Sequence, residues 1–210
     1  MKAVLVSGGE KIDKKILFRE TKDAYIICAD GGIKNFIDTN LLPDLLVGDL
    51  DSIDDMGKEF VKEKKILVNE YPKKKNLTDT ELAVSILVEK GFSEISILSA
   101  TGTRMDHTIA NMLLLEYLYD NNIFGKLIDN NNEIIFKSEE IFKVYKDNYK
   151  YLSLISISDE LIYSTNGMEY ETDHLNIKRY SARGVSNEIK DNFAQINIHS
   201  GRALIIKSND

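Results

Sequence analysis

The segment that decides the fold is Leu46-Val47-Gly48-Asp49-Leu50-Asp51-Ser52-Ile53. It begins as an apolar run that is typical of a buried strand, and the run stops at a glycine. Asp49 and Asp51 follow, one residue apart. Two carboxylates at the carboxyl edge of a strand suit Mg²⁺, which prefers oxygen ligands and often shares them with substrate phosphates. The segment therefore indicates metal-assisted phosphate chemistry, although Asp-x-Asp also occurs in turns that bind nothing.

Length and composition limit the classes of protein. The 210 residues are enough for one large domain or two small ones, and a hydrophobic fraction of 43% predicts a packed core. A net charge of −7 argues against a nucleic-acid-binding protein, and we interpret the lysines at 73–75 as a solvated loop. Cys28 is the single cysteine, which excludes an internal disulfide, and we interpret it as a packed side chain. With neither a signal peptide nor a membrane-length apolar run, we expect a cytoplasmic protein.

The first part of the chain alternates strand-like and helix-like segments. Strands are expected at residues 3–6, 24–29, 45–47, 66–68 and 95–98, and helices at residues 33–39, 78–90 and 105–119. The last helix is predicted because one face carries Met105, Ile109, Met112, Leu113 and Tyr117. Such alternation predicts an α/β domain with a mostly parallel sheet.

The pattern changes after about residue 126. Helical candidates stop, and short β-type runs follow at residues 134–136, 152–155, 161–163, 193–199 and 203–206. In one of them, Ala194, Ile196 and Ile198 alternate with polar residues, as in a strand with one buried face. We therefore predict an α/β domain over residues 1–128 and an antiparallel β-sandwich domain over residues 129–210.

Two glycine pairs follow predicted strands, in the turns Ser7-Gly8-Gly9 and Ala29-Asp30-Gly31-Gly32. Glycine allows a ligand to approach the backbone closely, and the free N–H groups at a helix start attract phosphate. Either turn alone is more often a plain tight turn. Two of them at the sheet edge that carries Asp49 and Asp51 favour a nucleotide pocket.

Two further segments carry polar side chains at predicted helix starts. Thr78 and Glu81 fit a capping box, while Asp79 suits the first turn of the helix and also a third oxygen position on a metal. The segment from 99 to 107 combines Gly102, a guanidinium at Arg104 and the pair Asp106-His107. Arg104 could bridge phosphate oxygens, and Asp106 could bind metal or cap the helix. We interpret His107 as a helix-start residue rather than a general base.

In this order and spacing, these segments resemble the thiamine pyrophosphokinase (thiamine diphosphokinase) family over the whole chain. Gly-Asp-x-Asp-Ser-Ile and Arg-x-Asp-His are the specific motifs. The resemblance implies an enzyme in which the hydroxyl of thiamine attacks the β-phosphorus of ATP. The pyrophosphoryl group moves as a unit, and thiamine diphosphate and AMP are the products. It also implies a homodimer whose thiamine sites lie between the α/β domain of one subunit and the β domain of the other.

The resemblance also implies roles for particular residues. Mg²⁺ would be held by Asp49, Asp51 and Asp79, with Asp106 completing the acidic cluster and Arg104 completing the catalytic set. Thiamine would be contacted by Tyr170, Ser186 and Asn187. The nucleotide would be contacted by Gly8, Gly9, Asp30, Gly31, Gly32, Thr78, Gly102, Arg104 and His107.

The chain departs from the family pattern at four positions. Asn76 stands where the family commonly has Asp, and Thr103 where it commonly has Gly. In the segment at 164–170, Glu169 and Tyr170 stand where the family has Lys and Trp. The metal carboxylates are intact, so the departures bear on acceptor contacts more than on the reaction.

Other classes of protein fit parts of the pattern. Asp-x-Asp after a strand also occurs in nucleotide-sugar glycosyltransferases, and in phosphatases that use the first aspartate as a nucleophile. A glycosyltransferase does not explain the segments around Asp79 and Asp106, and the later phosphatase motifs are not found. A nucleotide-binding module that has lost catalysis is the third alternative, and the substitutions at Asn76 and Glu169 are its support.

Overall fold

A parallel sheet forms the centre of the first of two units, Met1–Asn130. Neighbouring strands pair in parallel throughout. Their order is β4 (Val68–Glu70), β3 (Leu45–Gly48), β2 (Tyr25–Ala29), β1 (Lys2–Val6), β5 (Glu94–Leu98) and β6 (Phe124–Ile128). The order reverses between β1 and β5, which is where open α/β sheets bind ligands. The structure is a computed structural model that describes residues 1–71 and 76–210, so the loop predicted at the lysines 73–75 lies outside the described residues.

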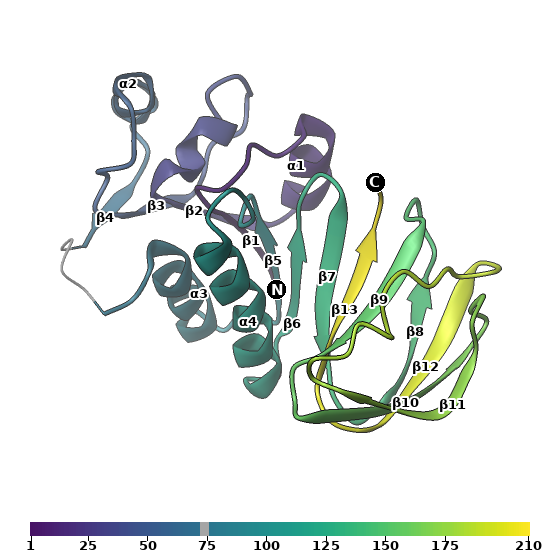
Figure 1. Ribbon diagram of the computed structural model, residues 1–210. Coiled ribbons are helices and arrows are strands. Elements are labelled where there is room, and N and C mark those ends of the chain that lie inside the picture. The colour runs from purple at the N-terminus through teal and green to yellow at the C-terminus, as the bar shows by residue number, and fades with distance from the viewer. Residues whose placement is uncertain (72–75) are drawn as a thin grey trace. The chain divides into compact units, whose positions relative to one another are not determined.

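Helices cover both faces of this sheet (Figure 1). α1 (Lys14–Thr21) and α2 (Asp55–Lys64) lie on one face, and α3 (Asp79–Glu89) and α4 (Met105–Asp120) lie on the other. The strands are therefore buried on both sides, which explains their continuous apolar sequences. Cys28 is fully buried in the core beneath the first face, as the sequence predicted. Among the residues that the structure describes, no helix combines the length and apolar character needed to cross a membrane.

Several elements differ from the sequence prediction: the strand predicted at 66–68 lies at 68–70 as β4, and β6, β8 (Ile141–Tyr145) and β11 (Thr172–Lys178) were not predicted. The helix predicted at 33–39 is wrong: a 3₁₀-helix, η1 (Asp30–Asn35), begins directly after β2 and ends before Phe36. At its end, the Asn35 side chain donates to the Gly32 carbonyl at 3.0 Å, and the Phe36 N–H donates to the Ile33 carbonyl. α1 and α2 were not predicted, because each buries few apolar residues and so shows a weak periodic pattern.

The second unit, Asn131–Asp210, contains two antiparallel groups of strands. In the first, β13 (Ala203–Ser208) pairs with β7 (Asn132–Lys137) and β9 (Tyr151–Ser156). The second has the order β11 (Thr172–Lys178), β10 (Glu160–Asn166), β12 (Phe193–Ser200) and β8 (Ile141–Tyr145). One core cluster draws Leu154 and Ile205 from the first group, and Leu161 and Ile196 from the second. The predicted fold class, an α/β unit followed by an antiparallel β-sandwich, is confirmed.

The buried face of α4 is not the face that the sequence pattern selected. The helix itself forms at Met105–Asp120, close to the predicted bounds. Its buried residues are Thr108, Asn111, Leu115 and Leu118, whereas Met105, Ile109, Leu113 and Tyr117 are exposed. The helix is therefore apolar on two faces, and only one of them packs on the unit's own core.

Candidate active site

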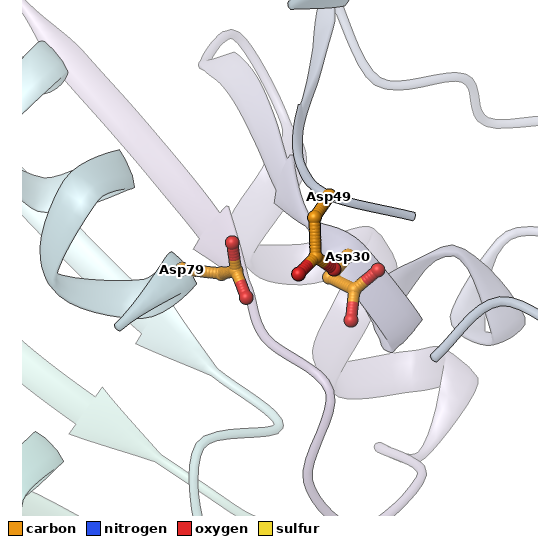
Figure 2. A group of neighbouring side chains, drawn as sticks. All are labelled: Asp30, Asp49 and Asp79. Carbon is orange, nitrogen blue, oxygen red and sulfur yellow. The ribbon is translucent and has the colours of Figure 1, made fainter. Parts of the chain in front are cut away.

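Three aspartates from separate elements meet at the carboxyl edge of the parallel sheet. Asp30 directly follows β2, Asp49 directly follows β3, and Asp79 is the first residue of α3. One carboxylate oxygen from each lies within 4.8 Å of the others (Figure 2). That spacing allows a single ion to contact all three carboxylates.

Asp51 occupies a different place in the turn. Its side chain is exposed, and its backbone N–H donates to Asp49 Oδ1 at 3.2 Å. Its own Oδ1 accepts a hydrogen bond from Ser52 Oγ at 3.2 Å. Among the described residues, the group of three carboxylates contains Asp30 in the position that the sequence analysis gave to Asp51. A metal-binding role for Asp51 stays a prediction.

Gly48 makes room for this acidic group. Its φ of +143° is a conformation that L side chains rarely adopt. A Cβ there would also lie 3.0 Å from Asp30 Cβ and 3.2 Å from Asp79 Oδ1. The glycine that ends the apolar run is therefore required by the backbone and by the close approach of two carboxylates.

The Asp30 carboxylate is poorly compensated by the protein itself. It is 7% exposed, and its Oδ1 has no hydrogen-bond partner among the described residues. Burial raises the pKa of Asp30, and the nearby charges of Asp79 and Asp49 raise it further, against the opposing effect of a hydrogen bond with Ser52. A buried, unpaired oxygen beside two carboxylates is a site that a cation would stabilise. A donor set made only of oxygens fits Mg²⁺.

The two glycine turns lie against each other beside the acidic group. A Cβ at Gly8 would be 3.6 Å from Gly31 Cα, which is ordinary contact. A Cβ at Gly9 would instead overlap the Ser99 and Thr101 carbonyls, and one at Gly32 would overlap the Val6 carbonyl. Gly9 and Gly32 therefore pack against backbone, whereas a Cβ at Gly8 or Gly31 would meet only ordinary contacts of 3.5 Å or more.

These turns border a pocket of ≈ 1020 Å³. It is lined by the loops after β1, β2 and β5, by the first turns of α3 and α4, and by Ser52. Of the residues predicted to contact a nucleotide, all except Gly32 line it: Gly8, Gly9, Asp30, Gly31, Thr78, Gly102, Arg104 and His107. A volume of this size accommodates a nucleotide-sized ligand.

The first turn of α3 forms one wall of the pocket. Thr78 caps the helix as predicted, since its Oγ1 accepts from the Glu81 N–H at 3.1 Å. Thr80 is buried and shares a hydrogen bond of 2.7 Å with Ser7 Oγ, which ties α3 to the loop after β1. This tether fixes Asp79, which lies between the two threonines.

Arg104, Asp106 and His107 begin α4. The Arg104 guanidinium contacts Asp106 Oδ2 at 2.6 Å, and both side chains are about two-thirds exposed, at 69% and 65%. Hydrogen bonding to Arg104 lowers the pKa of Asp106, so this carboxylate is ionised. Arg104 and His107 line the pocket. Asp106 lies outside the group of three carboxylates, and its place in the acidic cluster stays a prediction.

The residues predicted to contact thiamine lie in the second unit. Tyr170 is 72% exposed, so its ring is not part of a core. Asn187 supports the Tyr170 backbone: its Oδ1 accepts from the Tyr170 N–H at 3.0 Å, and its Nδ2 donates to the Tyr170 carbonyl at 2.8 Å. Ser186 has a φ of +60°, and its N–H donates to Ser153 Oγ at 3.0 Å. The Asn187 side chain therefore holds the Tyr170 backbone in place through two hydrogen bonds.

Together the sheet and its pocket define the class: an α/β protein with an acidic group and two glycine turns at the carboxyl edge of a parallel sheet. The family is given by sequence. The model of the thiamin pyrophosphokinase catalytic domain matches residues 19–125, and that of the thiamin pyrophosphokinase vitamin B1 binding domain matches residues 139–203. The chain belongs to the thiamine pyrophosphokinase family and is an enzyme of this kind.

Relatives agree over nearly the whole chain. Thiamine pyrophosphokinase of Bacillus subtilis (strain 168) is 29% identical, over 98% of both chains. The crystal structure of thiamine pyrophosphokinase from Bacillus subtilis superposes with a TM-score of 0.92 at 27% identity, over 100% of both chains. That of thiamin pyrophosphokinase from Geobacillus thermodenitrificans gives 0.86 at 25% identity, over 100% of this chain and 98% of the other. The family resemblance seen in the sequence is confirmed.

Some residues of the pocket were not found from the sequence. Asp30 was assigned to a nucleotide turn and not to the acidic group. The pocket also contains Ser7, Lys34, Thr80 and Asn111, which were not singled out. Asn111 lies one helix turn beyond His107, and its Nδ2 donates to the Ala100 carbonyl at 2.7 Å. Asn111 could have been noticed in the sequence as a polar residue on the side of α4 that faces the sheet.

Proposed function

We propose that this enzyme transfers the pyrophosphoryl group of ATP to the hydroxyl of thiamine in a Mg²⁺-dependent reaction, giving thiamine diphosphate and AMP. The observation that carries the proposal is the meeting of Asp30, Asp49 and Asp79, two of which, Asp30 and Asp79, line a pocket together with the two glycine turns. Oxygen donors suit Mg²⁺, and glycine turns suit phosphates. Family membership supports the choice of thiamine as acceptor.

In this proposal the protein mainly positions its substrates and balances their charge, because phosphoryl-type transfer asks little covalent chemistry of side chains. Asp30, Asp49 and Asp79 would hold Mg²⁺, which would neutralise charge on the phosphates. Gly8 and Gly31 let the phosphate chain approach the backbone. Arg104 adds a guanidinium at the pocket wall. Asp51 and Asp106 are further candidates for the acidic set.

Thiamine would be held through Tyr170, Ser186 and Asn187. The exposed ring of Tyr170 offers a face to the cationic thiazolium, and Asn187 fixes the backbone that carries this ring. Glu169 is exposed next to it and contributes negative potential. These features favour a cationic, aromatic acceptor.

We further propose that the enzyme acts in the cytoplasm as a homodimer, with the β unit of each copy supplying thiamine contacts to the pocket of the other. The exposed apolar face of α4 supports association. The net charge of −7 supports the expectation that nucleic acid is not a partner.

The alternative is a nucleotide-binding protein that has lost pyrophosphoryl transfer. The departures at Asn76 and Glu169 favour it, because they fall in segments that the family otherwise retains. An assay of the reaction products distinguishes the active enzyme from a protein that only binds nucleotide.

The assay incubates the purified protein with ATP, Mg²⁺ and thiamine and identifies products by ³¹P NMR and chromatography. We expect AMP and thiamine diphosphate in equal amounts, with no turnover after chelation of Mg²⁺ or with a thiamine analogue that lacks the hydroxyl. ADP with thiamine monophosphate would contradict transfer of the pyrophosphoryl group as a unit. Nucleotide binding without any product would favour the alternative.

A further inference from the structure

Lys34 places an ammonium group at the glycine turn of the pocket. The residue belongs to η1, one helical turn after Asp30, and its side chain lines the pocket. Its Nζ donates to the Gly8 carbonyl at 3.0 Å and to the Gly9 carbonyl at 2.5 Å. The ammonium therefore lies at the turn where a phosphate chain would approach the backbone.

The charge of Lys34 is not neutralised by these contacts. Both acceptors are uncharged carbonyls, and among the described residues no carboxylate forms an ion pair with Lys34. Arg104, the other cation of the pocket lining, is already paired with Asp106 at 2.6 Å. An ammonium has three N–H donors, so one donor of Lys34 is left after the two carbonyls are satisfied.

The positive charge of Lys34 determines which ligands of the pocket it attracts. An uncompensated ammonium attracts a polyanion and repels a cation such as the thiazolium of thiamine. The acidic group on Asp30, Asp49 and Asp79 has the opposite preference. The two centres suit one ligand that carries both phosphates and a bound divalent cation.

We propose that Lys34 binds the phosphate chain of the nucleoside triphosphate and orients it along the Gly8–Gly9 turn. The proposal rests on the proposed function, because it takes the nucleotide as the ligand of this pocket. A purely structural role would be to brace the turn through the two carbonyls. If Lys34 has only that role, its substitution should lower thermal stability and should not weaken the binding of phosphate-bearing ligands more than that of other ligands.

The test compares Lys34→Met, Lys34→Arg and the control Lys11→Met by calorimetric titration with a non-hydrolysable ATP analogue plus Mg²⁺ and with adenosine. Lys11 is a surface lysine that pairs with Asp38 at 3.1 Å, and it does not line the pocket. We expect Lys34→Met to weaken analogue binding by about 10- to 100-fold, the value of one charge-assisted contact, and adenosine binding by less than about twofold. Lys34→Arg and Lys11→Met should stay within about threefold of the unsubstituted protein.

Each other outcome overturns the inference. Equal losses for the analogue and for adenosine, or a lower melting temperature with unchanged analogue binding, would assign Lys34 to bracing. Analogue binding that Lys34→Met leaves intact would overturn the inference and leave the proposed function standing. Absence of analogue binding by the unsubstituted protein would overturn the proposed function and this inference with it.

Discussion

At the scale of single residues, the sequence predicted those site residues whose position follows from regular structure. Asp49 directly follows a strand and Asp79 starts a capped helix, so both positions could be inferred. Asp30 joins them because its backbone adopts a φ of +43° directly after β2, and no residue pattern announces that conformation. Tyr170 could not be assigned to core or surface from the sequence, whereas its exposure of 72% excludes the core.

The buried carboxylate of Asp30 gives a prediction at this scale. Asp30→Asn and Asp49→Asn each keep the size of the side chain and remove one charge. We expect turnover to fall by at least ~10²-fold in both, because charge stabilisation is usually a large part of such catalysis. A raised carboxyl pKa means that ionisation of Asp30 costs folded-state stability. Without Mg²⁺, Asp30→Asn should therefore melt at the same temperature as the unsubstituted protein or higher.

Thermal melts with and without Mg²⁺, together with steady-state rates, check this prediction. The added stability that Mg²⁺ gives the unsubstituted protein should be lost in both variants. Asp51→Asn is the informative comparison: a rate loss of the same size would place Asp51 in the metal site, as the sequence analysis predicted. Near-normal turnover in Asp30→Asn would remove Asp30 from that site.

At the scale of elements, α3 and five strands of the second unit, β7, β9, β10, β12 and β13, were predicted because local signals agree there. Thr78 caps α3, and Ala194, Ile196 and Ile198 alternate along β12 with their side chains buried. α1 could not be predicted in this way, since only Leu17 among its apolar residues is fully buried. Its attachment depends instead on a charged residue in its last turn.

That residue is Glu20, whose side chain is only 5% exposed. It accepts from Lys126 on β6 at 3.0 Å and from Ser96 on β5 at 3.2 Å, and it lies 3.9 Å from Lys2 on β1. Arg19 contacts its other oxygen at 2.9 Å. Glu20 therefore links α1 to three neighbouring strands.

We predict that Glu20→Gln lowers the free energy of unfolding by roughly 2–4 kcal/mol at pH 7, because it leaves Lys126 partly buried without a counter-charge. Burial alone would raise the pKa of Glu20, but the bonds and charges of Lys126 and Arg19 outweigh it and leave the pKa below 4.5. The stabilisation is therefore complete above the unfolded-state pKa and is lost as pH falls through the folded-state pKa.

Urea unfolding at pH 7, 5 and 3 measures the free energy of unfolding of the unsubstituted protein and of Glu20→Gln. The difference between these two free energies should become smaller as the pH falls below 4.5. The control is Glu59→Gln on the exposed side of α2, which should change stability by less than about 0.5 kcal/mol at every pH. A difference in free energy of unfolding that stays constant from pH 7 to pH 3 would show that the charge of Glu20 does not stabilise α1.

At the scale of the whole molecule, α4 carries an apolar face that is exposed in the single chain. Exposed fractions are 61% for Met105, 54% for Ile109, 42% for Leu113 and 43% for Tyr117, in a row at four-residue spacing. A contiguous row of exposed apolar side chains is typical of a surface that another protein surface covers. The sequence pattern selected this second face, because it is wholly apolar, whereas the core face carries the polar residues Thr108 and Asn111. We expect a second copy of the chain to cover it.

Leu113→Glu and Ile109→Glu test that assembly. A carboxylate buried in an apolar interface without a partner is strongly unfavourable, so we expect either variant to weaken dimerisation by at least ~10²-fold. Sedimentation velocity over a range of concentrations measures the dissociation constant. Turnover should fall in parallel with the dimer fraction, since thiamine contacts are proposed to come from the partner copy. Phe18→Glu is the matched control: Phe18 is also exposed, at 46%, but lies on α1. A fully active monomer, or dimerisation unchanged in both α4 variants, would show that this face does not join the subunits.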